Sequence, residues 1–405
     1  MLWNSIGSFI YLFGQWIITL LVVRLASDYS GAGYLNLAIT ITSIFGSLAT
    51  FNLRTYIISD HDAVHNAMQY VGFRVISCSA SFAFCCIYAL FFDYDVYQYT
   101  CIVLYMVFRV MEAATDCFYA FQQRELRMDI GGKSMIMRGV LSVVAFGMVF
   151  FIFQDTMLGI IGMLVVSGVV IVFFDIPQAR RFTSIKPKFS LDMMKRLFID
   201  GGLITLTSLL SDWVVTYVRQ MVDMILGTSA IGIYATVAAP VVIIQVGISY
   251  IFNPLLPALN ERYAASNKKG YFQYVFRVFA CVAVIAVLGV VLSIALGEPV
   301  LEFLYGQGIA DYSYLLPTLV LLTALNALQW FVRTLLVMQR VLVPPLLACL
   351  PALILCVVFV TPCIQANGLM GANYIIIGCY AASTVITLLI FFISTRRHFR
   401  ESSER

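Results

Sequence analysis

The chain has 405 residues, of which 61% are hydrophobic and 11% are charged, with a formal net charge of +4. A soluble domain is about half apolar and about a quarter charged, so this composition excludes a soluble enzyme with a sizeable domain in water. The apolar residues form runs of about 20, the length that crosses a hydrocarbon core about 30 Å thick. Because backbone groups in lipid must be satisfied internally, these runs are predicted to be helices.

Twelve such runs predict twelve transmembrane helices, at approximately residues 5–24, 33–52, 70–92, 97–121, 134–153, 157–176, 199–223, 230–253, 273–297, 312–338, 341–363 and 370–394. The long basic loop around Lys186 and Lys188 separates an N-terminal six-helix bundle, residues 1–185, from a C-terminal six-helix bundle, residues 186–405. An even number of helices in each half makes the halves parallel, an arrangement common among transporters. The predicted fold class is therefore an all-α integral membrane protein with two parallel six-helix bundles around a central cavity.

The basic residues indicate the orientation in the membrane. Nearly all of the 25 Lys and Arg residues fall in the even-numbered connections and the C-terminal tail, whereas the odd-numbered connections hold Arg24 and several acidic residues. The positive-inside rule therefore predicts that both termini are cytoplasmic. The ten cysteines lie in or at the edge of apolar spans without metal-type spacing, so we expect small buried side chains and no metal site or cofactor. No nucleotide-binding or hydrolase motif is present, which predicts that the protein is not an enzyme.

Three predicted helices carry charged stripes. Arg109, Glu112 and Asp116 are spaced i, i+3, i+7, and Asp212, Arg219 and Asp223 are spaced i, i+7, i+11, so each set shares one helix face. Asn326, Gln329 and Arg333 repeat the first spacing. An ionised side chain at mid-bilayer costs about 2.5–3.5 kcal/mol on insertion scales, so each must face a partner or water.

Two further stripes are uncharged, namely Asn4, Ser8, Tyr11 and Gln15 in the first helix and Asn36, Thr40, Ser43 and Ser47 in the second. Five polar faces drawn from both halves predict a hydrated cavity between the halves, with Trp330 placed to stack on a sugar ring. The residues predicted to line it are Asn4, Tyr11, Gln15, Asn36, Asn326, Gln329 and Trp330. The alternative is that these groups hold helices together by hydrogen bonds and packing.

The charged residues are assigned two roles. Arg109, Arg219 and Arg333 are predicted to bind an anionic group such as pyrophosphate, because a guanidinium stays charged and offers a fork of donors. Glu112, Asp116, Asp212 and Asp223 are candidates for coupling to H⁺ or Na⁺, because a carboxylate can load and release a cation. The alternative is an ion pair that keeps a helix in register, formed by Arg109 with Glu112 or by Arg219 with Asp223.

Two segments carry a resemblance to a known family. The start of the chain, Asn4-Ser5-Ile6-Gly7 through Val23-Arg24-Leu25 followed by Gly33-Tyr34, resembles that of the polysaccharide transporters of the Wzx type, the O-antigen and capsule-unit flippases. The stretch Phe118-Tyr119-Ala120-Phe121-Gln122-Gln123-Arg124-Glu125 is similar to a stretch of that family at the end of helix 4.

The resemblance implies the fold of the multidrug/oligosaccharidyl-lipid/polysaccharide exporter superfamily. It also implies that the chain moves an undecaprenyl-pyrophosphate-linked oligosaccharide from the cytoplasmic to the outer leaflet by alternating access, coupled to H⁺ or Na⁺. The expected location is the bacterial inner membrane. The expected partners are the lipid-linked oligosaccharide and the coupling ion, with no nucleic acid; a monomer and an association with polysaccharide polymerase and chain-length machinery are further expectations.

Two other functions compete with this interpretation. A cation-coupled multidrug efflux antiporter of the same superfamily often has an acid in its first helix, whereas the first acid here is Asp28, beyond the span. A cationic drug would also gain little from three buried arginines. A membrane-embedded polymerase or ligase acting on the same glycolipid is expected to have a long outer loop, whereas the outer connections of this chain are short.

Overall fold

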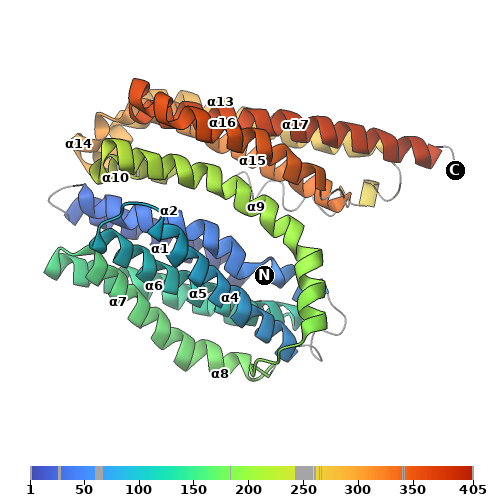
Figure 1. The fold of residues 1–405 in the computed structure, drawn as a ribbon, viewed down its shortest axis with the longest axis horizontal. Helices are drawn as coiled ribbons and strands as arrows, with labels where there is room; N and C mark the ends of the chain where they lie inside the picture. Colours follow the sequence, from blue (N-terminus) through green and yellow to red (C-terminus); the bar gives the residue numbers. More distant parts are fainter. Residues whose placement is uncertain are drawn as a thin grey trace. The chain divides into compact units, whose positions relative to one another are not determined.

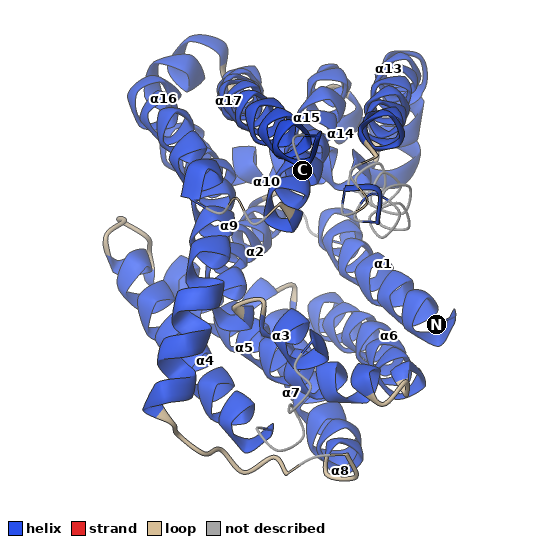
Figure 2. Ribbon diagram, turned by 90° about the vertical axis from the view of Figure 1, so that its right-hand side faces the viewer, coloured by secondary structure: helices blue, strands red, loops and turns tan. Residues whose placement is uncertain are grey.

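A computed structural model describes the chain apart from residues 1, 26–28, 60–66, 183, 242–258, 260, 264, 266, 340, 342 and 404–405. The described residues form helices joined by short loops and contain no strand (Figure 2). They divide into two compact units, Met1–Thr216 and Tyr217–Arg405.

The first unit consists of helices that cross it side by side (Figure 1). They are α1 Leu2–Leu25, α2 Ser30–Thr50, the short α3 Leu53–Ser59, α4 Ala67–Leu90, α5 Val96–Arg124, α6 Met128–Phe153, α7 Thr156–Val170 with its continuation into α8 Ile176–Ala179, and the first part of α9 Leu191–Leu226. The acidic residues Asp95 and Asp155 cap α5 and α7 by accepting the backbone N–H groups of Gln98 and Leu158, which fixes where these helices begin.

The second unit holds the rest of α9 and six longer or shorter helices. They are α10 Thr228–Ala238, α13 Lys268–Tyr305, α14 Gln307–Ala310, α15 Leu316–Met338, α16 Val343–Asn367 and α17 Leu369–Ser403, with 3₁₀ turns at Ala239–Val241 and Ser313–Leu315. An aromatic and aliphatic core that includes Tyr271, Phe331 and Phe391 joins α13, α15 and α17.

Ten described helical segments are long and apolar enough to cross a membrane. Of the other two predicted spans, α5 carries the Arg109–Asp116 stripe, and the span at 230–253 begins as α10 and then enters residues outside the described part. Large apolar side chains such as Phe151, Phe173, Leu288 and Ile354 are more than half exposed. Apolar surface of this extent is suited to lipid and not to water.

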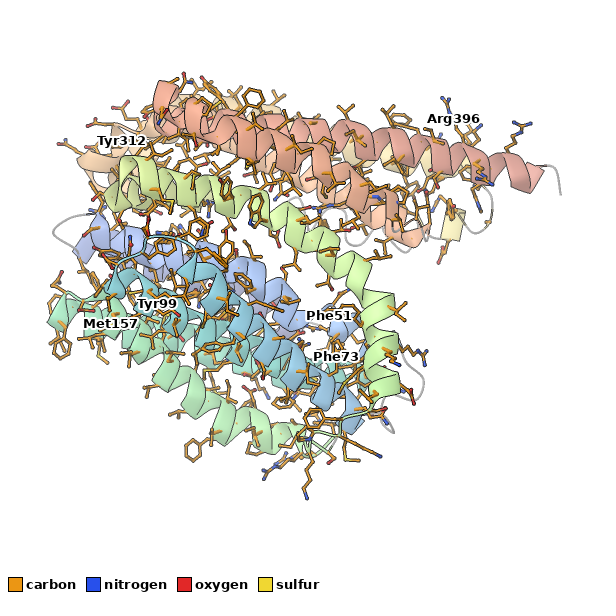
Figure 3. The ribbon with its side chains drawn as sticks, viewed as in Figure 1. Phe51, Phe73, Tyr99, Met157, Tyr312 and Arg396 are labelled. Carbon is orange, nitrogen blue, oxygen red and sulfur yellow. The ribbon has the colours of Figure 1, made fainter. Side chains whose placement is uncertain are left out.

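The two ends of each unit differ in charge. In the first unit, Phe51 and Phe73 lie at one end, near Arg54 and Arg74 in the sequence, whereas Tyr99 and Met157 lie at the other, near the acidic caps (Figure 3). In the second unit, Tyr312 and Arg396 lie at opposite ends (Figure 3). Each unit therefore has a basic and an acidic end, as the positive-inside prediction requires.

The first unit extends beyond residue 185, where the sequence predicts the first half to end. The backbone N–H of Lys188 donates to the carbonyl of Met68 at 2.9 Å, and Leu197 of α9 is buried in a cluster with Phe51 and Phe73. These contacts attach the linker and the start of α9 to α4, so the boundary between the units falls within α9.

Helices α1 and α6 pack against each other along their lengths (Figure 2). Gly7 and Gly14 of α1 face Gly132 and Gly139 of α6, so closely that a Cβ on Gly14 would lie 3.1 Å from the carbonyl oxygen of Gly139. A Cβ on Gly7 would overlap the backbone of Gly132. Small residues seven apart on both helices thus allow the two backbones to come together.

Between α7 and α8 the helix contains a π turn, Ile171–Asp175, in which the N–H of Ile176 donates to the carbonyl of Ile171. Pro177 follows directly. A proline has no N–H for an α-helical bond, and its ring would clash with the carbonyl of Phe173, four residues earlier. One extra residue per turn relieves this conflict, and such π turns occur frequently at functional sites.

Candidate functional site

A cavity of about 480 Å³ lies within the first unit. Its polar lining comes from α1, α2, α5, α6 and α9, and consists of Tyr11, Ser43, Ser47, Thr50, Arg109, Glu112, Asp116, Tyr119, Arg138 and Asp212. The structure thus brings together the predicted charged triplet of α5, Tyr11 of the α1 stripe, Ser43 and Ser47 of the α2 stripe, and Asp212.

Arg109 and Glu112 form an ion pair in this cavity, with 3.0 Å between Nη1 and Oε2. The hydroxyl of Tyr11 donates a hydrogen bond to the other oxygen of Glu112, and the ring of Tyr105 lies 5.6 Å from the Arg109 guanidinium carbon. The pairing that the sequence left as an alternative is therefore present. Glu112 nevertheless stays on the cavity wall, where it connects α5 to α1.

Asp116 is held by two arginines that lie outside the predicted set. Its carboxylate is 3.2 Å from Nη1 of Arg54 and 3.6 Å from Nη2 of Arg74. Arg54 also donates to the side chain of Gln123, and Arg74, which is 3% exposed, donates to the carbonyl of Ala49. Asp116 therefore joins α3, α4 and α5 at one end of the cavity.

We expect Asp116→Ala to destabilise the protein, because it leaves the Arg74 charge buried without its carboxylate. Breaking a buried pair costs roughly 3–5 kcal/mol, and the loss here should be smaller because Asp116 is partly exposed. The control is Asp129→Ala, whose partner Arg127 is more than half exposed and whose loss should cost at most about 1 kcal/mol. Thermal unfolding in detergent measures both. Equal, small shifts would show that Asp116 does not stabilise Arg74.

Arg138 of α6 enters the same cavity and has a different environment. It is 3% exposed, and its guanidinium carbon lies 5.5 Å and 5.7 Å from the ring centroids of Tyr11 and Tyr119. Its Nη2 donates to the Tyr119 hydroxyl at 2.7 Å, whereas its Nε and Nη1 are buried without a hydrogen-bond partner among the described residues. Two donors of a charged group are thus available to a ligand.

The α2 stripe faces α9 within the first unit. The hydroxyl of Ser47 donates to Asp212 at 3.0 Å, and the hydroxyl of Thr216 donates to the carbonyl of Thr40 at 3.2 Å. These bonds attach the first part of α9 to α2 and place the Asp212 carboxylate at the cavity.

Two predicted lining residues of the first unit have other surroundings. Gln15 accepts a hydrogen bond of 3.4 Å from the Tyr105 hydroxyl, and the buried Asn36 donates to the carbonyl of Ala32 within its own helix. Neither lines the cavity described above. The Asn4 side chain lies outside the described residues, so its predicted role stays a prediction.

The other predicted residues belong to the second unit. The guanidinium carbon of Arg219 lies 6.0 Å from the ring centroid of Tyr234, and Gln329 donates to Ser383 of α17 at 2.5 Å. Trp330 is 41% exposed, and Asp223 is buried. Asn326 and Arg333 are half-buried on α15. The prediction that these groups meet those of the first half in one chamber stays a prediction.

The sequence interpretation missed four charged residues of the first unit, namely Arg54, Arg74, Arg138 and Asp175. The three arginines were assigned to cytoplasmic connections. A signal was present, because Arg74, Arg138 and Asp175 all lie inside the spans predicted at 70–92, 134–153 and 157–176. A charge inside a predicted span is an indication of a functional or paired group.

Comparison with known proteins shows the fold. No family model and no curated protein matches the chain. Among solved structures, the chain is similar to an inward-facing multidrug resistance MATE family transporter of the MOP superfamily, with a TM-score of 0.75, 12% identity and 99% of each chain covered. An outward-facing structure of such a transporter gives a TM-score of 0.62 at 12% identity, covering 98% of this chain and 96% of that chain.

The MATE transporter VcmN of Vibrio cholerae in its bent form is a further match, with a TM-score of 0.55 and 15% identity, covering 98% of this chain and 97% of that chain. The chain therefore has the MATE transporter fold, which confirms the predicted fold class of an all-α membrane protein with about twelve helices in two bundles. This is also the superfamily fold that the sequence resemblance implies.

Proposed function

We propose that the chain is a flippase that moves an undecaprenyl-pyrophosphate-linked oligosaccharide from the cytoplasmic to the outer leaflet by alternating access. The fold supports a transporter, and the two sequence segments that resemble Wzx-type proteins support the substrate class. In this proposal the protein lies in the bacterial inner membrane with both termini in the cytoplasm, acts as a monomer, and works beside polysaccharide polymerase and chain-length machinery.

The observation that carries this proposal is the environment of Arg138. Its Nε and Nη1 donors are buried at the cavity without a protein partner, and the rings of Tyr11 and Tyr119 lie near its guanidinium. A guanidinium with unused donors suits the oxygens of a phosphate group. Arg109 adds a second guanidinium to the same wall. A cavity with these groups favours an anionic head group over a cationic drug.

The predicted roles of the other charged residues complete the proposal. Arg109, Arg219 and Arg333 provide further contacts to the anion along its path. Glu112, Asp116, Asp212 and Asp223 are the acids through which H⁺ or Na⁺ is coupled, and three of them line the cavity of the first unit. Each acid lies beside a group that moves little charge by itself, so cation loading would change the balance of charge at the cavity.

The test is export in a strain that lacks its own flippase and is supplied with the glycosyltransferases that make the lipid-linked unit. We expect the chain to restore surface polysaccharide, and Ala substitutions at Arg109, Arg219 and Arg333 together to abolish it while the protein still inserts. Labelling of the polysaccharide at the cell surface measures the result. Full export by the triple variant would contradict the proposed anion path.

A cation-coupled multidrug efflux antiporter is the second candidate, because the solved structures with this fold are multidrug resistance transporters. One geometric observation also favours it. The first helix has no acid of its own, but the hydrogen bond from Tyr11 brings the carboxylate of Glu112 to that helix. Dye efflux from everted vesicles under an imposed pH or Na⁺ gradient separates the candidates: efflux of a lipophilic cation, without restoration of polysaccharide, would support the antiporter.

A further inference from the structure

Behind Arg138, the π turn of the α7–α8 segment places a carboxylate in the interior of the first unit. Asp175, the last residue of that turn, is fully buried at 0% exposure. Neither of its oxygens accepts a hydrogen bond from the described residues. An ionised carboxylate in this position loses its hydration and gains no hydrogen bond, so its charge needs compensation from a nearby cation.

The charged and titratable groups around Asp175 come from two helices. Arg138 of α6 interacts electrostatically with Asp175, and Ser134 of α6 and Tyr119 of α5 lie beside it. The Tyr119 hydroxyl donates to Ser134 at 2.7 Å and accepts from Arg138. The flanking helices α7 and α8 contain no titratable residue. Arg138 is therefore the cation that balances Asp175 within this cluster.

Arg138 thus has two claims on one charge. On one side it lines the cavity with unused donors, and on the other it balances Asp175. An anion that binds in the cavity at Arg138 takes up the positive charge that Asp175 needs while it is ionised. The neutral form of Asp175 then becomes lower in free energy, because it no longer pays for a buried charge without compensation.

We propose that Asp175 binds a proton when a phosphate-type anion occupies Arg138, so that the anion and the proton are bound together. This inference rests on the proposed function, because it uses the same anion site. Binding free energies are linked reciprocally, so protonation of Asp175 also tightens anion binding. The affinity should rise as the pH falls, by up to about tenfold per pH unit for one linked proton.

The test uses the full-length protein in detergent and farnesyl pyrophosphate as the probe. Titration calorimetry in buffers of different ionisation enthalpy gives the number of protons taken up per ligand. We expect the wild type to take up about one proton more than Asp175→Asn, after the titration of the probe itself has cancelled in the comparison. The matched control, Asp129→Asn near the start of the same α6, should behave as the wild type because its carboxylate is paired with Arg127 at the surface.

An infrared difference spectrum of the wild type adds a readout that needs no variant, namely a new C=O band of a protonated carboxyl on addition of the probe. If Asp175→Asn does not fold, Asp175→Glu should fold and shift that band. Probe binding without the band, or with equal proton uptake in wild type and Asp175→Asn, would overturn the role of Asp175 and leave the proposed function intact. A wild type that does not bind the probe would contradict the proposed function, and the inference with it.

Discussion

Arg138→Ala is expected to reduce transport of the pyrophosphate-linked substrate by on the order of 10²–10³-fold. The substitution removes the guanidinium whose Nε and Nη1 are buried at the cavity without a protein partner. Truncating one partner of a buried, hydrogen-bonded charge pair costs about 2–5 kcal/mol, and each 1.4 kcal/mol corresponds to a factor of ten in affinity. Initial rates of flipping in liposomes, measured at a substrate concentration below saturation, would show the loss.

Two variants distinguish anion binding from a structural role of Arg138. Arg138→Lys keeps the charge and loses the fork of donors, so we expect it to retain part of the activity with a weaker affinity for substrate. Arg127→Ala removes an exposed arginine paired with Asp129 and should transport as the wild type does. If Arg138→Ala transported normally, or if Arg127→Ala lost as much activity, the cavity would not be the anion site.

Gly7→Ala is expected to destabilise the first unit and to lower transport with it. The added methyl would overlap the backbone of Gly132 on α6, and a backbone cannot rotate away as a side chain can. Overpacking costs about 1–3 kcal/mol and occasionally more, and we expect the upper end here. Separation of α1 from α6 would also move Tyr11 away from Glu112 and from the face of Arg138, two contacts that define the cavity wall.

The matched control for this substitution is Gly202→Ala in α9, where a Cβ would meet no atom within 4 Å. Alanine is favoured over glycine inside a helix by up to about 1 kcal/mol, so this variant should be as stable as the wild type or slightly more stable. Thermal unfolding in detergent, followed by the fraction of monodisperse protein, compares the two. Equal melting temperatures for the two variants would contradict the close α1–α6 packing.

Helical spacing was sufficient to predict part of the candidate site. The i, i+3, i+7 pattern places Arg109, Glu112 and Asp116 on one face of α5, and all three line one cavity together with Ser43 and Ser47 of the α2 stripe. Composition and the length of the apolar runs were sufficient for the fold class, because lipid restricts a spanning chain to helices or closed barrels. Both predictions depend on local periodicity and on the solvent alone.

Periodicity does not identify the neighbour that a polar face meets. Gln15 and Asn36 belong to correct stripes, but one bonds Tyr105 and the other bonds its own helix. The partners of Asp116 are a further example, since Arg54 and Arg74 come from α3 and α4 and reach it only in the folded unit. Arg138 was assigned to a loop because arginines are common at span ends, and its burial depends on the aromatic rings of α1 and α5.

Asp175 was missed for a different physical reason. A stripe analysis assumes about 100° per residue throughout a helix, and the π turn at Ile171–Asp175 breaks that assumption. A side chain beyond such a turn points elsewhere than the ideal period predicts.

The same turn makes the length of this segment critical in a way that its composition does not reveal. Deleting one residue, for example Val172, would let the chain continue with ordinary α-helical geometry and would rotate Asp175 by about 100° relative to the preceding part of the helix. Hydropathy and the ability to span the membrane would barely change. A single-codon gain or loss in related genes would therefore connect or disconnect the acid from Arg138, which makes this position a simple genetic route between proton-linked and proton-independent carriers.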